Sequence, residues 1–282
     1  MPQVRLQQAT IVYDVLGPAD SAHPPVLFVH GVLVDHRLWS QVAEILARNG
    51  FRCILPDWPL GSHRTPVDAG ADMSPRGVAA MIRDLIVALD LSDVTLVGND
   101  TGGGLCQLVV DAYPEHVGRL VLTNCDAFDK FPPFPFDFVF ALLRGPKSIK
   151  MLMAMMRSKA LRHSPFGYGL ILSDPDPALT ASWLQPCRTD DRICRDLATL
   201  LRHIAKTDLT DVATRLPRFT KPVSIVWGQD DRCFTPSLGR RLASQFPNVT
   251  MTEVAGAKTF VALDNPQAVV DAIETVGAAR SA

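Results

Sequence analysis

The sequence has no apolar run of the roughly 20 residues that cross a bilayer, and its most apolar stretch, Phe136 to Leu143, is too short. It has no excess of one charge either, with 28 Lys and Arg against 29 Asp and Glu. Bulk electrostatics therefore favour neither a nucleic acid nor a membrane surface as partner. We expect a small-molecule substrate, and we leave a homodimer open.

Paired metal-binding cysteines are also lacking. Six cysteines occur singly among the 282 residues, with no CxxC pair and no interleaving with His at zinc spacing. There is no G-x-G-x-x-G or P-loop sequence, so we expect neither a metal nor an organic cofactor. The first residues lack the apolar segment of a secretory signal. Reduced cysteines in a cytoplasmic protein are the resulting prediction.

Short apolar runs alternate with segments of helical period, which predicts an α/β protein with a mostly parallel sheet. Ser74-Pro75 is a good helix start, and the apolar residues after it recur at helical spacing. The predicted strands are 26–30, 51–55, 94–97, 119–123, 221–227 and 248–254.

The alternation stops between residues 127 and 211. This stretch begins with a proline- and aromatic-rich entry and continues with Met-rich helical segments. We interpret it as a helical cap inserted into a core formed by residues 1–126 and 212–282. An apolar, Phe- and Met-rich cap would shape a pocket and exclude water.

The most informative motif is Gly98-Asn99-Asp100-Thr101-Gly102, between a predicted buried strand and a helix. A G-x-nucleophile-x-G elbow requires this context, because glycines let strand and helix approach while the central side chain is pushed into the cleft. The helix N-terminus favours negative charge there. An aspartate that merely caps a helix is the alternative, and the context argues against it.

Two further motifs follow predicted strands. His30-Gly31-Val32 is placed to supply one N–H of an oxyanion hole from Val32, with Thr101 supplying the other. Trp227-Gly228-Gln229-Asp230-Asp231 offers an acid that could orient a base, although Gly-x-Asp-Asp is also good turn chemistry.

Together these motifs resemble the α/β-hydrolase superfamily, and within it the branch of haloalkane dehalogenases, fluoroacetate dehalogenases and epoxide hydrolases that uses an aspartate nucleophile. The segments PDWPLGSHR (56–64), GNDTGG (98–103) and WGQDDR (227–232) are also similar to bacterial hydrolase-like proteins of unassigned substrate. The resemblance implies an α/β-hydrolase fold with a mostly parallel eight-stranded sheet and a helical cap. It implies Asp100 as nucleophile, forming an ester that a His-activated water hydrolyses, and Asp231 as the acid, with Asp126 as a second place for that acid.

The sequence departs from this family at the histidine. Counting back from Pro266 places Thr259 at that position, and no histidine follows His203. Threonine cannot act as a general base near neutral pH, and such a base is typically worth about 10²–10⁴-fold in rate. His36, His63 or Lys258 could replace it, the protein could run another reaction, or the substitution could be engineered.

The usual halide donors are also absent, since Thr101 follows the nucleophile where the resemblance expects tryptophan and Val32 stands where an asparagine often does. Tyr168 is the one cap tyrosine that could activate an epoxide, and Trp183 and Phe166 could line the pocket. We therefore predict a hydrolase-type enzyme acting on an epoxide, ester or alkyl halide. The alternative is a lyase, isomerase, cyclase or ligand-binding protein on the same scaffold. The candidate oxyanion and substrate-binding residues are His30, Gly31, Val32, His36, Thr101, Tyr168, Trp183 and Thr259.

Overall fold

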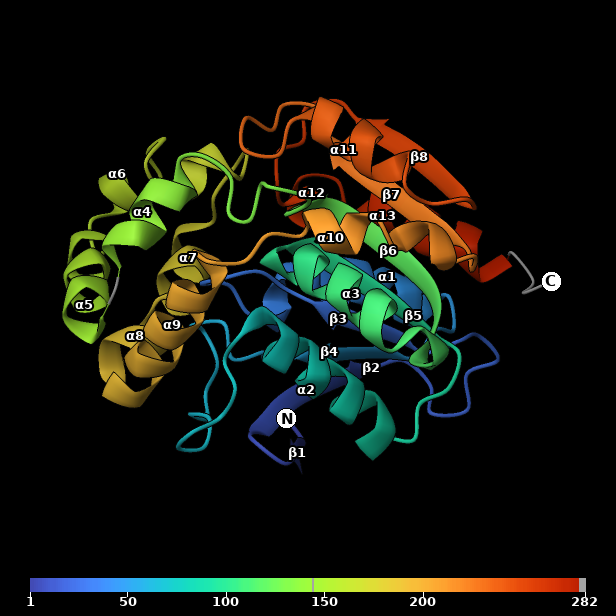
Figure 1. Cartoon of the computed structure of the whole chain (residues 1–282), viewed down its shortest axis with the longest axis horizontal. Coiled ribbons are helices and arrows are strands. Elements are labelled where there is room, and N and C mark those ends of the chain that lie inside the picture. The colour runs from blue at the N-terminus through green and yellow to red at the C-terminus, as the bar shows by residue number, and fades with distance from the viewer. Residues whose placement is uncertain (144, 279–282) are drawn as a thin grey trace.

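The computed structural model describes residues 1–143 and 145–278. In this part of the chain the strands form one eight-stranded sheet with the order β1-β2-β4-β3-β5-β6-β7-β8 (Figure 1). The pairs β1/β2 and β2/β4 are antiparallel and all the others are parallel. The predicted fold class is therefore confirmed. The strands are β1 (Gln3–Arg5), β2 (Thr10–Leu16), β3 (Val26–Val29), β4 (Cys53–Pro56), β5 (Val94–Asp100), β6 (Val117–Cys125), β7 (Val223–Gly228) and β8 (Val249–Val254).

Helices cover both faces of the sheet (Figure 1). On one face α2 (Pro75–Ala88) packs on α3 (Thr101–Ala112), and α3 packs on β5 and β6. On the other, α13 (Pro266–Ala278) packs on β6, β7 and α1 (Ser40–Arg48). The start of α2 is the predicted one, because the Ser74 side chain accepts a hydrogen bond from the Gly77 N–H and Pro75 lies in the first turn. Burial of both faces explains why the central strands read as continuous apolar runs.

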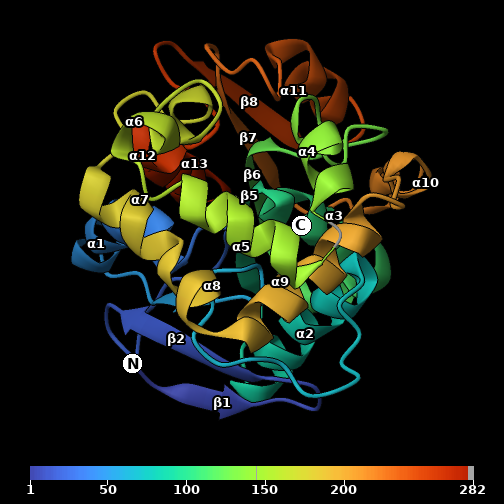
Figure 2. The same ribbon diagram turned by 90° about the vertical axis from the view of Figure 1, so that its left-hand side faces the viewer.

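Between β6 and β7 the described residues form helices and loops, with no strand of the sheet. We name residues 127–211 the cap segment. Its main helices lie beyond one end of the sheet, and Figure 2 looks onto them. They are α4 (Phe136–Leu142), α5 (Pro146–Met155), α6 (Lys159–Arg162), α7 (Pro177–Trp183), α8 (Gln185–Thr189) and α9 (Asp191–Ile204).

The remaining helices return the chain to the core. The helix α10 (Thr210–Ala213) crosses the predicted boundary at residue 211 and packs against α3. It is followed by α11 (Pro236–Ala243) and α12 (Val261–Asp264), both beside β7. Within the described residues, no helix is both long enough and apolar enough to cross a membrane.

Candidate active site

The turn from β5 into α3 holds Asp100 in an unusual backbone conformation, with φ 53° and ψ −133°. Residues other than glycine rarely adopt a positive φ, and such strain persists only where the surroundings enforce it. At Gly102, an added Cβ would lie 2.4 Å from the Val29 carbonyl oxygen, so only glycine permits this approach of helix to strand. The close approach fixes Asp100 at the head of α3, at the carboxyl end of the sheet.

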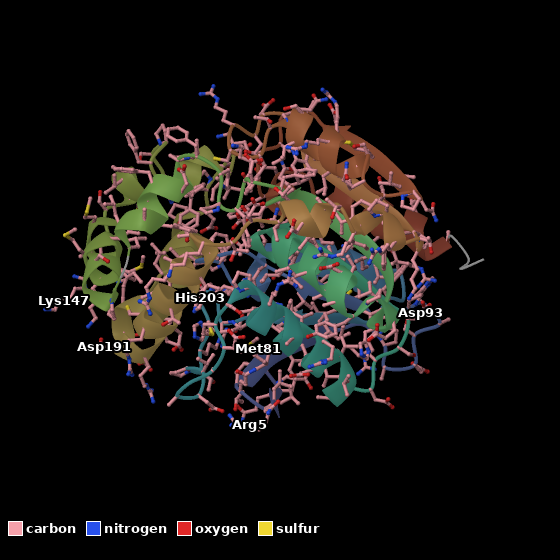
Figure 3. The ribbon with its side chains drawn as sticks, in the orientation of Figure 1. Arg5, Met81, Asp93, Lys147, Asp191 and His203 are labelled. Carbon is pink, nitrogen blue, oxygen red and sulfur yellow. The ribbon has the colours of Figure 1, made fainter. Side chains whose placement is uncertain are left out.

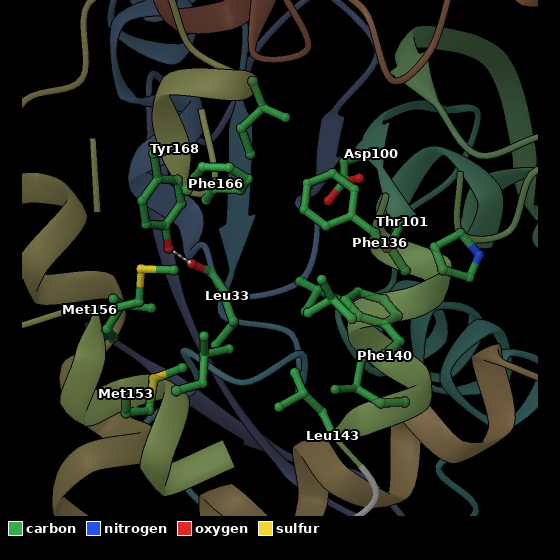
Figure 4. A pocket seen from close by; sticks show the side chains of 18 of the residues that line it. Leu33, Asp100, Thr101, Phe136, Phe140, Leu143, Met153, Met156, Phe166 and Tyr168 are labelled. Atoms are coloured by element: carbon green, nitrogen blue, oxygen red, sulfur yellow. Dashed lines mark hydrogen bonds between the residues drawn. The ribbon is translucent and has the colours of Figure 1, made fainter. Parts of the chain in front are cut away.

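A cavity of about 170 Å³ lies between this turn and the cap segment. Figure 4 shows Asp100 and Thr101 on one side of it and Tyr168, Met153 and Met156 on the other. Asp100, Thr101 and Tyr168 have polar side chains, and the other side chains that line the cavity are apolar. The lining consists of Val32, Leu33, Asp100, Thr101, Pro132, Pro133, Phe136, Val139, Phe140, Leu143, Leu152, Met153, Met156, Phe166, Gly167, Tyr168, Ile171, Leu184 and Leu201.

The loop after β3 runs directly against the Asp100 side chain. A Cβ added at Gly31 would lie 2.0 Å from Asp100 Oδ2, which explains the glycine. Both predicted oxyanion residues, Val32 and Thr101, direct their backbone N–H groups at the Asp100 carboxyl group. His30 is buried behind the loop, where its Nε2 accepts a hydrogen bond from the Trp58 N–H at 2.9 Å and its Nδ1 lies 2.9 Å from the Gly31 oxygen. The His30 ring therefore supports the loop from behind and does not line the cavity.

Burial dominates the electrostatics of Asp100. Removal from water raises the pKa of its carboxyl group to about 7. The N–H groups of Thr101 and Val32 offset part of this rise by stabilising the charged form, and the charge of Asp231 adds to it. Near neutral pH the protonated and ionised forms of Asp100 therefore coexist.

Asp231 lies in a hydrogen-bonded environment at the end of β7. Its Oδ1 accepts the N–H groups of Cys233 and Phe234 at 2.7 and 3.0 Å. Its Oδ2 accepts Asn124 Nδ2 and the Thr259 hydroxyl, both at 2.8 Å. Burial raises the pKa of Asp231 to about 6, although these hydrogen bonds lower it. Thr259 thus contacts the acid, as a histidine at this position would, but its side chain does not line the cavity.

Asp126, the second candidate acid, is in a different setting. It is buried at the end of β6, where the Thr101 side chain favours its charged form. Burial, followed by the charge of Asp100, raises its pKa well above the usual value. The structure thus joins Asp231, and not Asp126, to Thr259.

Neither candidate replacement histidine lines the cavity. His36 Nδ1 lies 2.6 Å from Asp57 Oδ1. His63 Nε2 lies 3.2 Å from Asp196 Oδ2, joining a core loop to α9 of the cap segment. The expectation that His36 binds substrate is therefore not supported, because its ring is directed to a buried carboxylate.

Lys258 also has a structural setting. Its ammonium group donates to the carbonyl oxygens of Gly169 and Leu172 in the cap segment at 2.8 and 3.3 Å, and it does not line the cavity. An ammonium group bound in this way stabilises the contact between cap segment and core. No group that can act as a base, apart from Asp100 and the Tyr168 phenol, lines the cavity within the described residues.

Two predicted aromatic residues differ in their placement. Tyr168 lines the cavity, and its hydroxyl donates to the Leu33 carbonyl oxygen at 2.5 Å (Figure 4). Trp183 does not line it: the ring is fully buried between Tyr168 and Phe260, and its Nε1 donates to Asp35 Oδ1 at 3.0 Å. The prediction that Trp183 lines the pocket is therefore corrected, because this side chain packs in the core. Phe166 does line the cavity, as predicted.

One group of side chains has metal-ligand character among the described residues: Asp35, His36 and Asp57, whose ligand atoms lie within 4.8 Å of one another. Arg37 already pairs with Asp35 at 2.6 Å and Arg64 with Asp57 at 3.1 Å. Because cations of the protein already compensate these carboxylates, the group is best explained as an internal ion-pair cluster. The expectation that the protein needs no metal stays a prediction.

Sequence reasoning missed two asparagines that support the site. Asn99 Nδ2 donates to Thr123 Oγ1 at 2.8 Å and to the Thr259 carbonyl oxygen at 2.7 Å, joining the elbow to the loop before α12. Asn124 holds Asp231 through Nδ2 and accepts the Gly228 N–H at 2.6 Å. Their positions at the ends of two adjacent buried strands were the available signal.

Comparison with known proteins gives a consistent result. A 2-hydroxy-6-oxononadienedioate/2-hydroxy-6-oxononatrienedioate hydrolase of Cupriavidus pinatubonensis is 26% identical, over 80% of this chain and 77% of that protein. Haloalkane dehalogenase 2 of Mycobacterium tuberculosis is 27% identical, over 89% and 86%. The crystal structure of an inferred ancestral haloalkane dehalogenase superposes with a TM-score of 0.78 at 19% identity, covering 99% of this chain and 100% of that one. Such relatives support an enzyme of the hydrolase type.

The model of the alpha/beta hydrolase fold family matches residues 24–266. The match spans the loop after β3, the elbow, the cap segment and the ends of β6 and β7, where every candidate catalytic residue lies. The chain therefore belongs to the α/β-hydrolase fold family.

Proposed function

We propose that the protein is a hydrolase-type enzyme in which Asp100 attacks an electrophilic carbon of a small or medium apolar substrate, with residues 127–211 acting as a cap on a core of residues 1–126 and 212–282. The observation that carries the proposal is the position of Asp100. Among the described residues it is the one carboxyl group in the cavity lining, whose other side chains are apolar except for those of Thr101 and Tyr168. An ionised carboxylate in such a site has lost part of its hydration, which favours attack on an apolar electrophile.

The first half-reaction needs no other side chain. A carboxylate oxygen forms a bond to carbon while a carbon–halogen bond breaks, or while an epoxide ring opens and its oxygen takes a proton from solvent. The product in both cases is an ester of Asp100. An activated ester substrate would give a mixed anhydride and release its alcohol.

The second half-reaction has no evident base. Water must be deprotonated to attack the ester, and the position beside Asp231 holds the Thr259 hydroxyl. General base catalysis is typically worth about 10²–10⁴-fold, so we expect the covalent ester to hydrolyse slowly and to accumulate.

Intact-mass measurement tests this proposal. The protein is incubated with a panel of epoxides, alkyl halides and activated esters, and the mass is followed with time. We expect a gain equal to the transferred group with at least one class, and peptide mapping should locate it at Asp100. The matched control is Asp100→Asn, which keeps size and shape but removes the nucleophilic carboxylate and should show no gain.

A second candidate follows from the pKa of about 7 at Asp100, which suits a general acid or base near neutral pH. In that case Asp100 would move a proton on a bound apolar carbon acid, as in a lyase or isomerase. Exchange of substrate deuterium with solvent, without any covalent adduct, would favour it. If no tested compound gave adduct, turnover or exchange, the nucleophile proposal would be wrong.

A further inference from the structure

Exposed apolar side chains are concentrated on one part of the cap segment. Among the described residues, eight large apolar residues are at least half exposed. Six of them lie between residues 134 and 166. Soluble proteins rarely expose such a concentration unless it contacts something. The six are Phe134 (76% exposed), Phe138 (66%), Leu142 (61%), Met151 (65%), Met155 (52%) and Phe166 (84%).

The helix α4 is apolar on both of its sides. Phe136 and Phe140 line the cavity, whereas Phe138 and Leu142, four residues apart, are exposed on another side. A helix that is apolar all round is normally buried all round. We name Phe134, Phe138, Leu142, Met151 and Met155 the outer apolar face; none of them lines the cavity.

Exposed basic residues lie on and just after α5, which carries two residues of this face. Residues 134–166 contain six Lys or Arg and one Asp, a formal charge of +5, whereas the whole chain carries −1; of these, Lys150 pairs with Asp191 and Arg162 is buried. Lys147 lies four residues before Met151 on α5 and is exposed, and Figure 3 shows it at the outer edge of the molecule. Arg157 and Lys159, just after α5, are also exposed.

We propose that the outer apolar face docks onto an anionic lipid surface. Phe, Leu and Met side chains would enter the boundary between headgroups and acyl chains, while the basic residues beside them would meet the lipid phosphates. A second copy of this chain is a poorer occupant. A twofold contact through the same face would bring the exposed Lys147, Arg157 and Lys159 of both copies together.

The cavity also reaches the surface of the cap segment. Phe166 lines the cavity and is also 84% exposed, so it connects the interior to that surface. An apolar compound dissolved in the lipid could enter beside Phe166 without crossing bulk water. Docking is independent of whether Asp100 acts as a nucleophile or as a proton-transfer group.

Vesicle flotation tests the proposal. The full chain is mixed with vesicles of phosphatidylcholine alone, or of phosphatidylcholine and phosphatidylglycerol in equal parts, and the bound fraction is measured at low and high salt. We expect binding to the anionic vesicles only, and loss of binding at high salt. The double variant Phe138→Ser, Leu142→Gln should lower the partition coefficient at least about tenfold. Lys147→Gln and Lys159→Gln should each lower it about fivefold.

Two control substitutions lie outside the cap segment. Val87→Ser removes an exposed apolar side chain from α2, and Arg48→Gln removes an exposed charge from α1. Both should bind as the unaltered chain does. Folding of each variant is checked by circular dichroism and by adduct formation in solution. Equal binding to neutral and anionic vesicles, no binding to either, or a dimer in sedimentation that the double variant abolishes would each overturn the proposal.

Discussion

At the scale of single residues, the site is defined by carboxyl groups that have no cation beside them. Asp126 and Asp231 are buried and Asp100 is partly buried at the cavity, and removal from water is the largest cause of the raised pKa of each. An imidazole beside Asp231 would have compensated its charge. The Thr259 hydroxyl donates a hydrogen bond to this acid instead, but it cannot carry charge or accept a proton from water.

If Asp100 forms a covalent ester, as proposed, an imidazole at position 259 should speed its hydrolysis. We predict that Thr259→His places a base next to Asp231 and speeds hydrolysis of the Asp100 ester by about 10²–10⁴-fold. The measurement is the decay of the adduct mass after excess substrate is removed. Thr259→Ser keeps a hydroxyl and is the matched control, expected to leave the decay unchanged. Equally slow decay in Thr259→His, with the fold intact, would contradict the assignment of this position.

The pH dependence of adduct formation reports on Asp100 itself. Because only the carboxylate is nucleophilic and its pKa is about 7, the rate should rise as the pH increases through about 7 and reach a plateau above it. The test is the initial rate of mass gain with an uncharged substrate across this range. A rate that is flat from acidic to neutral pH would mean that Asp100 ionises at the usual aspartate pKa.

At the scale of elements, a hydrogen bond from Tyr168 joins the cap segment to the loop after β3. Tyr168 donates to the Leu33 carbonyl oxygen, and Leu33 directly follows Val32. The bond occupies the phenol proton that would otherwise be free to activate a substrate oxygen. Its role in the structure is therefore to hold the cap segment against the loop that faces Asp100.

We predict that Tyr168→Phe lowers the free energy of unfolding by about 1 kcal/mol, the usual contribution of one hydrogen bond. Adduct formation should fall to the same extent for epoxides and alkyl halides, because no substrate-activating proton is lost. Urea unfolding and adduct rates with both classes are the measurements, with Tyr13→Phe on β2 as control. A loss confined to epoxides would instead show that the Tyr168 hydroxyl activates the ring oxygen.

Prediction of the elements from sequence succeeded where burial was complete. The six predicted strands correspond to β3 through β8, because each lies in a parallel part of the sheet and most are continuously buried. The strands β1 and β2 were not located. The first has three residues and the second is mostly half-buried, so neither produces a continuous apolar run. Antiparallel strands also need no crossover helix between them, so an alternation of strand and helix patterns does not indicate β1 and β2.

At the scale of the whole molecule, buried acids link stability to pH. Asp100 and Asp231 have pKa values of about 7 and 6 in the folded state, against about 3.9 in an unfolded chain. Between these values the folded state binds more protons than the unfolded state. Their contribution to stability is therefore complete below about pH 4 and is lost as the pH rises through 6 and 7.

We predict that Asp100→Asn is more stable than the unaltered chain at about pH 8, and that the difference shrinks towards about pH 5. The reason is that asparagine cannot ionise in the buried site. Comparing the two proteins cancels the opposite effect of carboxylates such as Asp57, whose pKa is lowered through its hydrogen bond with His36 despite burial. Urea unfolding at both pH values measures the difference. A difference that did not vary with pH would contradict a raised pKa at Asp100.

The sequence by itself determined the fold class and predicted the turn at Asp100 and the departure at Thr259, because these depend on local patterns of burial, glycine and strand ends. It could not decide whether a distant His or Lys faces the cavity. Only the tertiary structure shows His36, His63 and Lys258 bonded elsewhere. Nor could the net charge of −1 reveal the basic, apolar outer side of the cap segment, since a sum over the chain discards where folding places each charge.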